Sequence, residues 1–520
     1  MFNSTRIWIL PLALALICSI ESIAGFVTAP PGSSWTAILP RNTADVNGYL
    51  GIIEETRQGH LLAHNLFTAE PHPGFQIRPY YMMLGLIGRV VPQVSTVTLM
   101  EIGRFVSSFC FLLLLALIAK RLFESNRDRI LAVLVLAFAS GLGWTRLVQD
   151  PPDLRIVEFS NFLAIISPPL YTAALSLIAG IFLLLDRAWR SATVGEVLRF
   201  SIPAAFLGLW LGLDRPFSTA TLVIAVGCCL LGDVIRNKKL NTQSLAAVLP
   251  LFIGIFLALS YQYFSVRRIP VYAAWNHQHV LPTPAIPQLV ISLGLLIPIA
   301  LYGLFLLRRR APQFANLLGF YALAAVLLSH FPIQFQERFW EGLPICVSIL
   351  ASCAVVAMLN QFRNAGWVIG AVAIVGVLII SDVIVVRRDL NAIVLHQPPQ
   401  YIPDQLVDGL QEMKKLVNAD EAVLSAESSG NFIVGYAARR VVLGHKVATA
   451  NYEEKWKLVR RILTTPATDA SKLIKQSGAT WLFWGPEERA VSRGVFNPNA
   501  APYLMKEYDN TIVILYKIKM

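Results

Sequence analysis

The sequence predicts an α-helical protein that crosses a membrane many times and ends in a small α/β domain. Of its 520 residues, 55% are hydrophobic and only 15% are charged, a combination that soluble domains rarely show. The apolar residues gather in runs long enough to span a bilayer. The net charge of +12 comes from short basic clusters between those runs, so it indicates membrane topology rather than a nucleic-acid partner.

About eleven apolar runs of spanning length follow one another along the chain. They cover residues 7–27, 97–119, 130–148, 164–185, 200–213, 217–235, 245–264, 289–307, 314–331, 343–359 and 368–386. We interpret the first run as an uncleaved signal-anchor helix. The fifth run is short and ends at Asp214-Arg215-Pro216, which leaves open a re-entrant or paired short helix. All six cysteines lie inside apolar runs, so neither a disulfide nor a zinc site is expected.

Basic clusters occupy alternate connections between the runs, as the positive-inside rule predicts for cytoplasmic loops. They are Lys120, Arg121, Arg127 and Arg129, then Arg187 and Arg190, then Arg236, Lys238 and Lys239, then Arg308, Arg309 and Arg310. The remaining connections are expected to face outward, and an odd number of spans puts the C-terminus there too. We therefore predict a multi-pass domain over residues 1–386, with an outer loop at 30–78, and an extracytoplasmic α/β domain over 387–520.

Within the C-terminal domain, helix-like and strand-like patterns alternate, which suggests a largely parallel sheet. Helices are predicted at 401–417, 430–437 and 452–463, and strands at 422–426, 441–443, 481–484 and 511–516. The chain has no phosphate-cradling GxxxxGK[ST], no GxGxxG after a strand and no HExxH. Neither a nucleotide nor a redox cofactor is expected.

Asp45 is the first candidate catalytic residue. Apolar residues recur at helical spacing after it, which predicts a helix at the membrane interface with Asp45 in its first turn. A carboxylate there could act as a general base toward a hydroxyl or amine acceptor, because such acceptors become nucleophilic only as the proton leaves. The alternative is an ordinary helix-start residue, since aspartate is favoured in the first turn whatever the function.

Two further acids, Asp150 and Asp153, lie in the next outer loop. Carboxylates from separate loops could bind a divalent cation or share acid and base roles. A Pro-rich turn that carries solvated acids explains the same residues. The identity of any metal is left open.

A third candidate is Arg338, which has aromatic neighbours in the outer connection 331–342. An unpaired guanidinium at membrane depth is costly, and an anionic phosphate would satisfy it. Pairing with Glu337 or Glu341 would satisfy it equally well.

The connection 267–287 mixes aromatic side chains with amide and imidazole groups, among them Trp275 and His277. Such a set suits sugar binding, because ring faces stack on sugars while polar groups hydrogen-bond the hydroxyls. An aromatic belt at the membrane interface is the alternative. His277 and His279 are two residues apart, which would not bring them to one helix face as metal ligands.

Short motifs along nearly the whole chain resemble those of the GT-C superfamily of membrane glycosyltransferases, especially bacterial relatives of the protein O-mannosyltransferase and aminoarabinose-transferase group. They include Asp45 with Tyr49, Arg78-Pro-Tyr-Tyr-Met-Met-Leu-Gly, Ser140-Gly-Leu-Gly-Trp144, Trp275-Asn-His-Gln, Gln336-Glu-Arg-Phe-Trp-Glu-Gly and Tyr436-Ala-Ala-Arg-Arg-Val-Val-Leu-Gly-His445. Many family members have an acidic pair in the first loop, whereas here Val46 follows Asp45.

The resemblance implies transfer of a sugar from a polyprenyl-phosphate carrier to a glycan, lipid or protein acceptor, on the outer side of a bacterial inner membrane. It maps the catalytic carboxylate onto Asp45 and the phosphate-binding cation onto Arg338, with Arg78 or Arg215 as helpers. Two other classes stay open. A transporter or flippase would need ionisable residues in the middle of several helices and inverted repeats, and a non-catalytic subunit of envelope-polysaccharide assembly would keep the fold alone.

Overall fold

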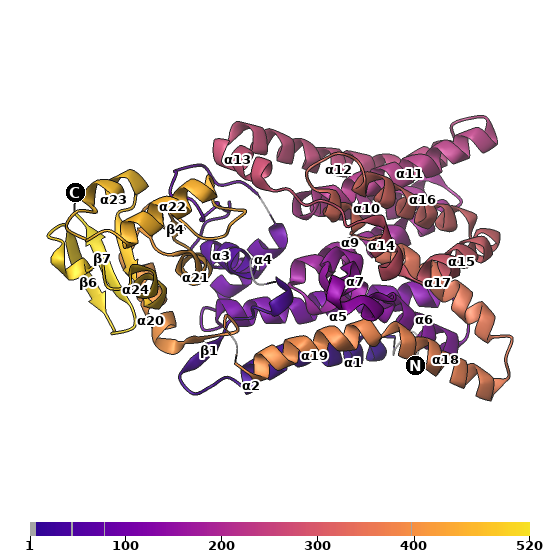
Figure 1. The fold of residues 1–520 in the computed structure, drawn as a ribbon. Coiled ribbons are helices and arrows are strands. Elements are labelled where there is room, and N and C mark those ends of the chain that lie inside the picture. The colour runs from indigo at the N-terminus through magenta and orange to yellow at the C-terminus, as the bar shows by residue number, and fades with distance from the viewer. Residues whose placement is uncertain (1–6, 43–44, 77, 397, 520) are drawn as a thin grey trace. The chain divides into compact units, whose positions relative to one another are not determined.

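The structure is a computed structural model that describes residues 7–42, 45–76, 78–396 and 398–519. The chain forms two compact units, each assembled from separate stretches of sequence (Figure 1). The first unit consists of Met1–Glu21, Ile102–Gln262 and Val280–Leu390. The second unit consists of Ser22–Glu101, Tyr263–His279 and Asn391–Met520.

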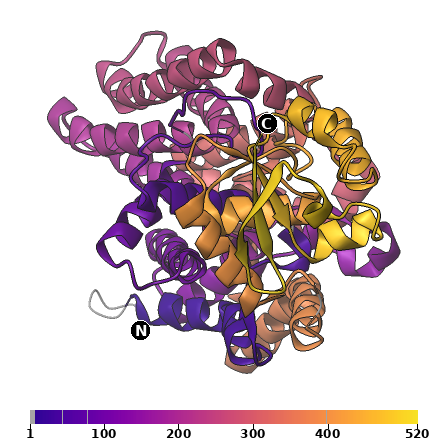
Figure 2. The ribbon, with the colours of Figure 1, turned by 90° about the vertical axis from the view of Figure 1, so that its left-hand side faces the viewer.

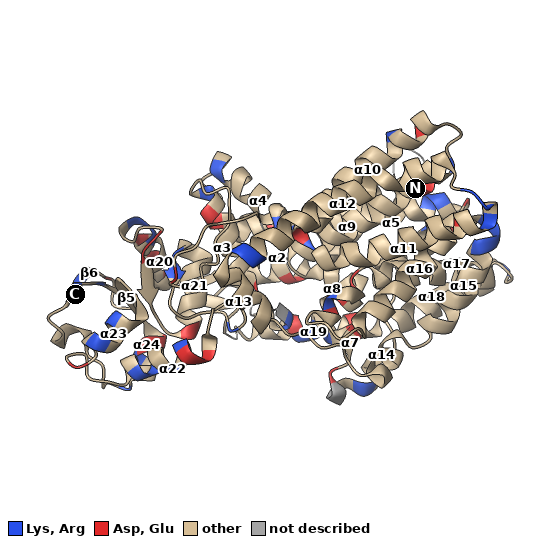
Figure 3. Ribbon diagram, turned by 90° about the horizontal axis from the view of Figure 1, so that it is seen from above, with Lys and Arg blue, Asp and Glu red and all other residues tan. Residues whose placement is uncertain are grey.

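Among the described residues, eight helices are long and apolar enough to cross a membrane, and eleven spans result if each of three bent helix pairs counts as one. Six of them are single helices, α5 (Thr96–Leu122), α9 (Pro169–Trp189), α10 (Val194–Asp214), α11 (Pro216–Asn237), α12 (Thr242–Arg268) and α16 (Pro312–Ser329). The other two extend beyond one α-helix: Asn126–Leu147 contains α6 (Asn126–Phe138) and most of a 3-10 helix, and Gln336–Leu359 contains a 3-10 helix and α17 (Leu343–Leu359). Figure 3 shows long helical stretches that are almost free of charged residues. The predicted polytopic helical fold is confirmed.

Three predicted runs are bent helix pairs. The pairs are α1 (Ile9–Cys18) with α2 (Ile20–Val27), α14 (Ile286–Leu293) with α15 (Leu296–Arg310), and α18 (Asn364–Leu378) with α19 (Ile380–Val394). The sharpest bend, 66° between α14 and α15, falls at Gly294, whose φ of +50° suits a residue without Cβ. At the first bend, Ser19 donates its hydroxyl to the carbonyl of Ala15, a bond that often bends helices.

The fifth run is a full-length helix, so the short or re-entrant helix that we left open is not present there. α10 has 21 residues and begins at Val194. The apolar run begins later in the sequence because the first turns of this helix carry charged residues. The hydroxyl of Thr193 accepts a hydrogen bond from the backbone N–H of Glu196 and fixes this start. Pro216 then occupies the first turn of α11, a position where its missing N–H costs nothing.

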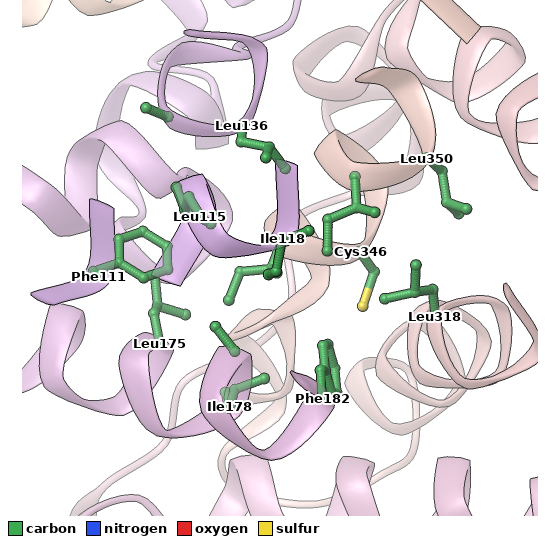
Figure 4. Close-up of a cluster of buried hydrophobic side chains, with 14 of the residues drawn as sticks. Phe111, Leu115, Ile118, Leu136, Leu175, Ile178, Phe182, Leu318, Cys346 and Leu350 are labelled. Carbon is green, nitrogen blue, oxygen red and sulfur yellow. The ribbon is translucent and has the colours of Figure 1, made fainter. Parts of the chain in front are cut away.

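The core of the first unit is formed by side chains from α5, α6, α9, α16 and α17. Figure 4 shows ten of them: Phe111, Leu115, Ile118, Leu136, Leu175, Ile178, Phe182, Leu318, Cys346 and Leu350. Close backbone approach adds to this packing, because a Cβ at Gly303 of α15 would lie 1.7 Å from the carbonyl oxygen of Leu350 in α17. The shorter elements of this unit are α7 (Pro152–Arg155), α8 (Asn161–Ile166), η2 (Gly143–Gln149), η3 (Val157–Phe159) and η4 (Gln336–Trp340).

In the second unit, two short helices of the first loop region pack together and against the C-terminal part of the chain. α3 (Val46–Arg57) contacts both α4 (Pro79–Val90) and α21 (Glu427–Ala437). The antiparallel pair of β1 (Ser33–Trp35) and β2 (Tyr401–Pro403) places Trp35 opposite Tyr401. The other non-sheet elements are η1 (Pro40–Asn42) and α13 (Pro270–Gln278).

The C-terminal sheet has the strand order β4-β3-β5-β7-β6 and is drawn in orange and yellow in Figure 2. β3 (Ala422–Leu424) pairs in parallel with β4 (Arg440–Val441) and β5 (Trp481–Trp484), whereas β7 (Ile514–Ile518) is antiparallel to both β5 and β6 (Leu504–Asp509). The prediction of a largely parallel sheet was therefore wrong for its second half. β6 was missed because Met505, Lys506 and Glu507 are exposed, so this edge strand lacks an apolar pattern. The helices are α20 (Asp404–Leu416), α21, α22 (Tyr452–Leu463), α23 (Ser471–Ser477), α24 (Pro486–Ser492) and η5 (Pro498–Ala500).

Candidate active site

Asp45 directly precedes α3, but its side chain does not cap the helix. One carboxylate oxygen instead lies 3.4 Å from Nε2 of His445, and the Asp45 side chain is 31% exposed. The ordinary role of a helix-start aspartate, a hydrogen bond to a free backbone N–H, is therefore not what holds this carboxylate. It is in contact with a histidine and is still accessible from solvent.

The ring of His445 is held in one orientation by the backbone of its own loop. Its Nδ1 accepts hydrogen bonds from the N–H groups of Val447 and Ala448, both at 3.1 Å. A neutral imidazole whose Nδ1 accepts carries its proton on Nε2, which is the atom nearest Asp45. His445 ends one of the motifs that resemble the family, but the sequence gives it no role, because 400 residues separate it from Asp45.

Tyr49, one helical turn after Asp45, is in contact with a cation. Tyr49 is almost fully buried and stacks on Tyr81 with ring centroids 4.6 Å apart. The guanidinium carbon of Arg78 lies 4.7 Å from the centre of the Tyr49 ring, a favourable cation–π distance. Within the described parts of the chain, no carboxylate forms an ion pair with Arg78. We call Asp45, His445, Tyr49 and Arg78 the Asp45 cluster.

The backbone at Arg78 is also unusual. Arg78 has φ of +56° and precedes Pro79, the first residue of α4. A residue with a side chain rarely adopts this left-handed conformation, and such positions are often tied to function. The conformation fixes where the guanidinium emerges.

Three other acids of the first loop are each engaged by a basic side chain. Glu54 accepts from Lys414 at 2.7 Å, Glu55 contacts Nδ1 of His64 at 2.5 Å, and Glu70 accepts from Lys455 at 2.7 Å. Glu54 and Glu55 are buried. These contacts make all three less suited than Asp45 to accept a proton from a substrate.

In the first unit, two predicted cations meet at one carboxylate. Arg215 donates to Glu158 at 2.7 Å and pairs with Glu341 at 3.0 Å, while Arg338 donates to the same oxygen of Glu158. Arg338 thus pairs with Glu158, a glutamate that its sequence neighbours did not suggest. Two arginines and two glutamates give no net charge. We call these four residues the arginine–glutamate cluster.

The arginine–glutamate cluster is enclosed by protein. The side chains of Glu158, Glu341 and Arg215 are 3%, 1% and 7% exposed, against 15% for Arg338. Burial alone would raise the pKa of Glu158, but Arg338 and Arg215 outweigh it and hold that pKa below its ordinary value. The guanidinium of Arg215 also lies 5.0 Å from the Tyr171 ring centre. Its environment is that of a structural ion-pair network.

Asp150 and Asp153 lie in different environments. Asp150 is exposed and pairs with Arg155 at 3.2 Å. Asp153 is buried, and its Oδ2 accepts from the backbone N–H of Gly143 at 3.2 Å and from the hydroxyl of Ser381 at 2.9 Å. No group of three or more His, Cys, Asp or Glu side chains that could hold a metal ion is found among the residues that the structure describes.

Trp275 and His277 both lie on α13. Trp275 packs against a buried cluster that includes Phe75 and Tyr272, and His277 is exposed. The neighbouring Gln278 donates to the backbone carbonyls of Val447 and Thr449 at 3.3 and 3.0 Å. Helix α13 is thus fastened to the loop that carries His445.

The comparisons with known proteins identify a fold. Neither a protein-family model nor a curated protein matches the chain. The solved structures of ArnT from Cupriavidus metallidurans, in the apo state and bound to undecaprenyl phosphate, match with a TM-score of 0.55 and 11% identity over 99% of this chain and 98% of theirs. The oligosaccharyltransferase of Archaeoglobus fulgidus, tethered to an acceptor peptide with an NVT sequon, matches with a TM-score of 0.51 and 14% identity over 99% of this chain and 74% of its own. The chain therefore has the fold of the GT-C glycosyltransferases.

Proposed function

We propose that this protein is a glycosyltransferase that moves a sugar from a polyprenyl-phosphate donor to an acceptor on the extracytoplasmic side of a bacterial inner membrane. The observation that carries the proposal is the Asp45 cluster, which combines an accessible carboxylate with a cation that has no carboxylate partner among the described residues. The GT-C fold supports it. One structure with this fold holds undecaprenyl phosphate and another an acceptor peptide, in line with a lipid-linked donor and a separate acceptor.

The proposed reaction is a single displacement at the anomeric carbon of the sugar. A hydroxyl or amine of the acceptor forms the new bond while its proton passes to the Asp45 carboxylate. The bond between the anomeric carbon and the phosphate oxygen breaks, and the polyprenyl phosphate leaves with the electron pair. His445 is a positioning residue here, because its Nε2 lies 3.4 Å from Asp45, and a proton on that nitrogen orients the carboxylate and favours its ionised form, the form that can accept a proton.

We assign the phosphate-binding role to Arg78 rather than to Arg338, which the sequence resemblance favoured. A phosphate gains most from a cation whose charge is not already balanced. Arg338 and Arg215 share Glu158 within a neutral cluster, whereas Arg78 faces an aromatic ring. Arg338 and Arg215 are then structural residues in this proposal.

The orientation rests on the distribution of basic residues. The clusters between alternate spans would face the cytoplasm, which leaves the loop 30–78 and the C-terminal domain on the outer side. The sugar, the acceptor and any metal requirement are left open, with Asp150, Asp153, Trp275 and His277 as further candidate substrate contacts.

The substitution Asp45→Asn tests the proposal, because it keeps the shape of the side chain and removes its basicity. A strain that lacks the gene is complemented with wild type or variant, and its lipid-linked sugars and envelope glycans are measured by mass spectrometry. We expect the variant to lower transfer by about 1,000-fold, so that one polyprenyl-phosphate sugar accumulates.

Asp509→Asn is the matched control, because Asp509 is 35% exposed against 31% for Asp45 and pairs with Lys506 on the edge strand β6, outside the proposed site. It should complement fully, and both variants should reach the membrane in equal amounts. Full complementation by Asp45→Asn would refute the assignment. Accumulation of the same sugar lipid on the cytoplasmic side alone would instead indicate a flippase.

A further inference from the structure

A second site lies in the second unit, away from the Asp45 cluster. It is a cavity of about 510 Å³, which is within the usual range for small-ligand sites. Parts of α3, β1, α20 and α21 line it, together with the segment that leads into α5. None of the four residues of the Asp45 cluster contributes to its wall. Glu54, on this wall, follows Asp45 by nine residues, which corresponds to about 13 Å along a helix.

The charged side chains of this cavity leave an excess of one positive charge. Arg57, Lys414 and Glu54 line it, and Glu54 accepts from Lys414 at 2.7 Å and lies 3.6 Å from Arg57. The oxygen of Glu54 nearer to Arg57 also accepts from the hydroxyl of Thr96 at 2.6 Å. The one carboxylate among the described lining residues therefore has both oxygens occupied. Arg57 also donates to the Thr96 hydroxyl and the Pro92 carbonyl, both at 2.9 Å. Its five N–H groups and the three of Lys414 still leave donors for a further partner.

Uncharged polar side chains, among them Trp35, Gln411 and Tyr436, also line the cavity. Trp35 and Tyr436 line the cavity and are 4% and 8% exposed. The indole N–H of Trp35 and the hydroxyl of Tyr436 have no hydrogen-bond partner within the described part of the chain, although buried groups of this kind are usually satisfied. The side-chain amide of Gln411 has one contact, to the carbonyl of Tyr436 at 3.5 Å. A net positive charge, together with the Trp35 and Tyr436 groups that can donate to a further partner, suits an anion with several oxygens.

The cavity lies at the ends of two predicted membrane spans. Phe26, in the last turn of α2, and Thr96 and Val97, the first residues of α5, line it. Both helices belong to spans that are long and apolar enough to cross a bilayer. Phe26 is 45% exposed, which leaves an apolar edge beside the polar wall. A lipid headgroup lies at this depth in a bilayer, with its chains beside the apolar helices.

We propose that this cavity binds the phosphate of an anionic membrane lipid through Arg57, Lys414 and the donors around them. The lipid would be a resident ligand of the second unit, separate from the sugar donor and acceptor. The binding is independent of the proposed transfer, since the two sites share no residue.

Binding of dioleoyl phosphatidylglycerol to the purified full-length protein, followed by native mass spectrometry from detergent, tests this proposal. Dioleoylglycerol has the same chains without phosphate and should bind at least tenfold more weakly. Gln411→Glu adds a negative charge to the wall, which repels the lipid phosphate, and leaves the Glu54 contacts in place. It should weaken phosphatidylglycerol binding by about tenfold. Lys414→Gln should do the same by removing a cation.

Lys415→Gln is the matched control, because Lys415 is 70% exposed, pairs with Glu412 and does not line the cavity. It should bind phosphatidylglycerol like the wild type, and so should Asp45→Asn. Unchanged binding in both Gln411→Glu and Lys414→Gln would overturn the proposal, as would equal binding of dioleoylglycerol. Displacement of the lipid by millimolar inorganic phosphate would overturn the lipid as the source of the phosphate.

Discussion

Two regions of this protein contain arginine side chains with different partners, and they differ in how the charge of the arginine is balanced. In the arginine–glutamate cluster, Arg215 and Arg338 share Glu158, and every member is at most 15% exposed. In the Asp45 cluster, Asp45 contacts a histidine and Arg78 faces a tyrosine ring. Charges that balance one another in the interior stabilise a fold, whereas a cation with no carboxylate partner among the described residues is available to an anionic substrate.

Sequence alone favours Arg338 over Arg78 as the cation that binds phosphate. All three arginines lie beside aromatic residues in connections that the sequence predicts to face outward, and Arg338 is the residue that the family resemblance selects. They differ in the side chain that each contacts in the folded protein: Arg215 and Arg338 pair with glutamates, and Arg78 contacts a tyrosine ring. For a buried pair, loss of one member leaves an uncompensated charge, while loss of an unpaired surface cation leaves nothing unsatisfied.

The largest effect expected from this difference is on stability. Arg215→Met would leave Glu158 and Glu341 buried without their shared partner, and should lower the free energy of unfolding by about 3–5 kcal/mol. Arg78→Met, the matched substitution in the other cluster, should change it by about 0.5 kcal/mol or less. Reversible unfolding in mixed micelles with increasing denaturing detergent measures both. Equal losses would show that the two arginines do not differ in kind.

The next effect is on the reaction. Arg78→Gln should lower kcat/KM for the polyprenyl-phosphate donor by about 10- to 100-fold, the loss expected for one charge-assisted contact with phosphate. Arg338→Gln should act through stability, with little change in kcat/KM for the protein that remains folded. Initial rates in membranes at several donor concentrations separate the two. If Arg338→Gln has the larger effect on kcat/KM, the phosphate role returns to Arg338.

A smaller effect is expected at His445. His445→Leu removes the N–H that faces Asp45 and should lower the transfer rate by about tenfold. His445→Gln can place an amide N–H near the same point, so it should recover most of that rate. The pH profile of transfer adds a second readout, since a purely structural role would not move it. Equal rates in the Leu and Gln variants would argue against hydrogen bonding to Asp45.

His445 also marks the limit of what sequence could predict. The spans followed from runs of apolar residues, because burial in a bilayer depends on local composition. All eleven runs correspond to helices or bent helix pairs. The position of Asp45 before a helix followed from local periodicity as well. The partner of Asp45 lies 400 residues away, and so its identity depends on tertiary packing that no spacing rule encodes.

The same limit applies to the ion pairs. Sequence neighbours offered Glu337 and Glu341 to Arg338, whereas the structure supplies Glu158 from a different connection. The exposed edge strand β6 was missed for a related reason, because its polarity reflects its place in the sheet rather than its conformation. Local sequence patterns predicted helices and strands, whereas the ion-pair partner of each charged side chain depends on contacts between residues far apart in the sequence.

The smallest effect concerns a third kind of charge pair, one that is balanced but exposed. Glu70 is 47% exposed and accepts from Lys455 and from Thr68. Partial burial would raise its pKa, but these hydrogen bonds outweigh burial and lower it. Because the folded pKa is below the unfolded value, the stabilisation is present at neutral pH and is lost as pH falls below the ordinary value near 4.5.

Glu70→Gln should therefore cost only about 0.5 kcal/mol at pH 7, since Glu70 is 47% exposed and solvent screens its charge, and the cost should be smaller at pH 3. Lys455→Gln and the double variant complete a thermodynamic cycle, measured by the same unfolding experiment at both pH values. A coupling energy as large as the loss in Arg215→Met would mean that pairing alone sets the strength of these contacts. A small coupling energy would support burial as the property that gives Arg215 its large effect on stability and leaves Arg78 with a small one.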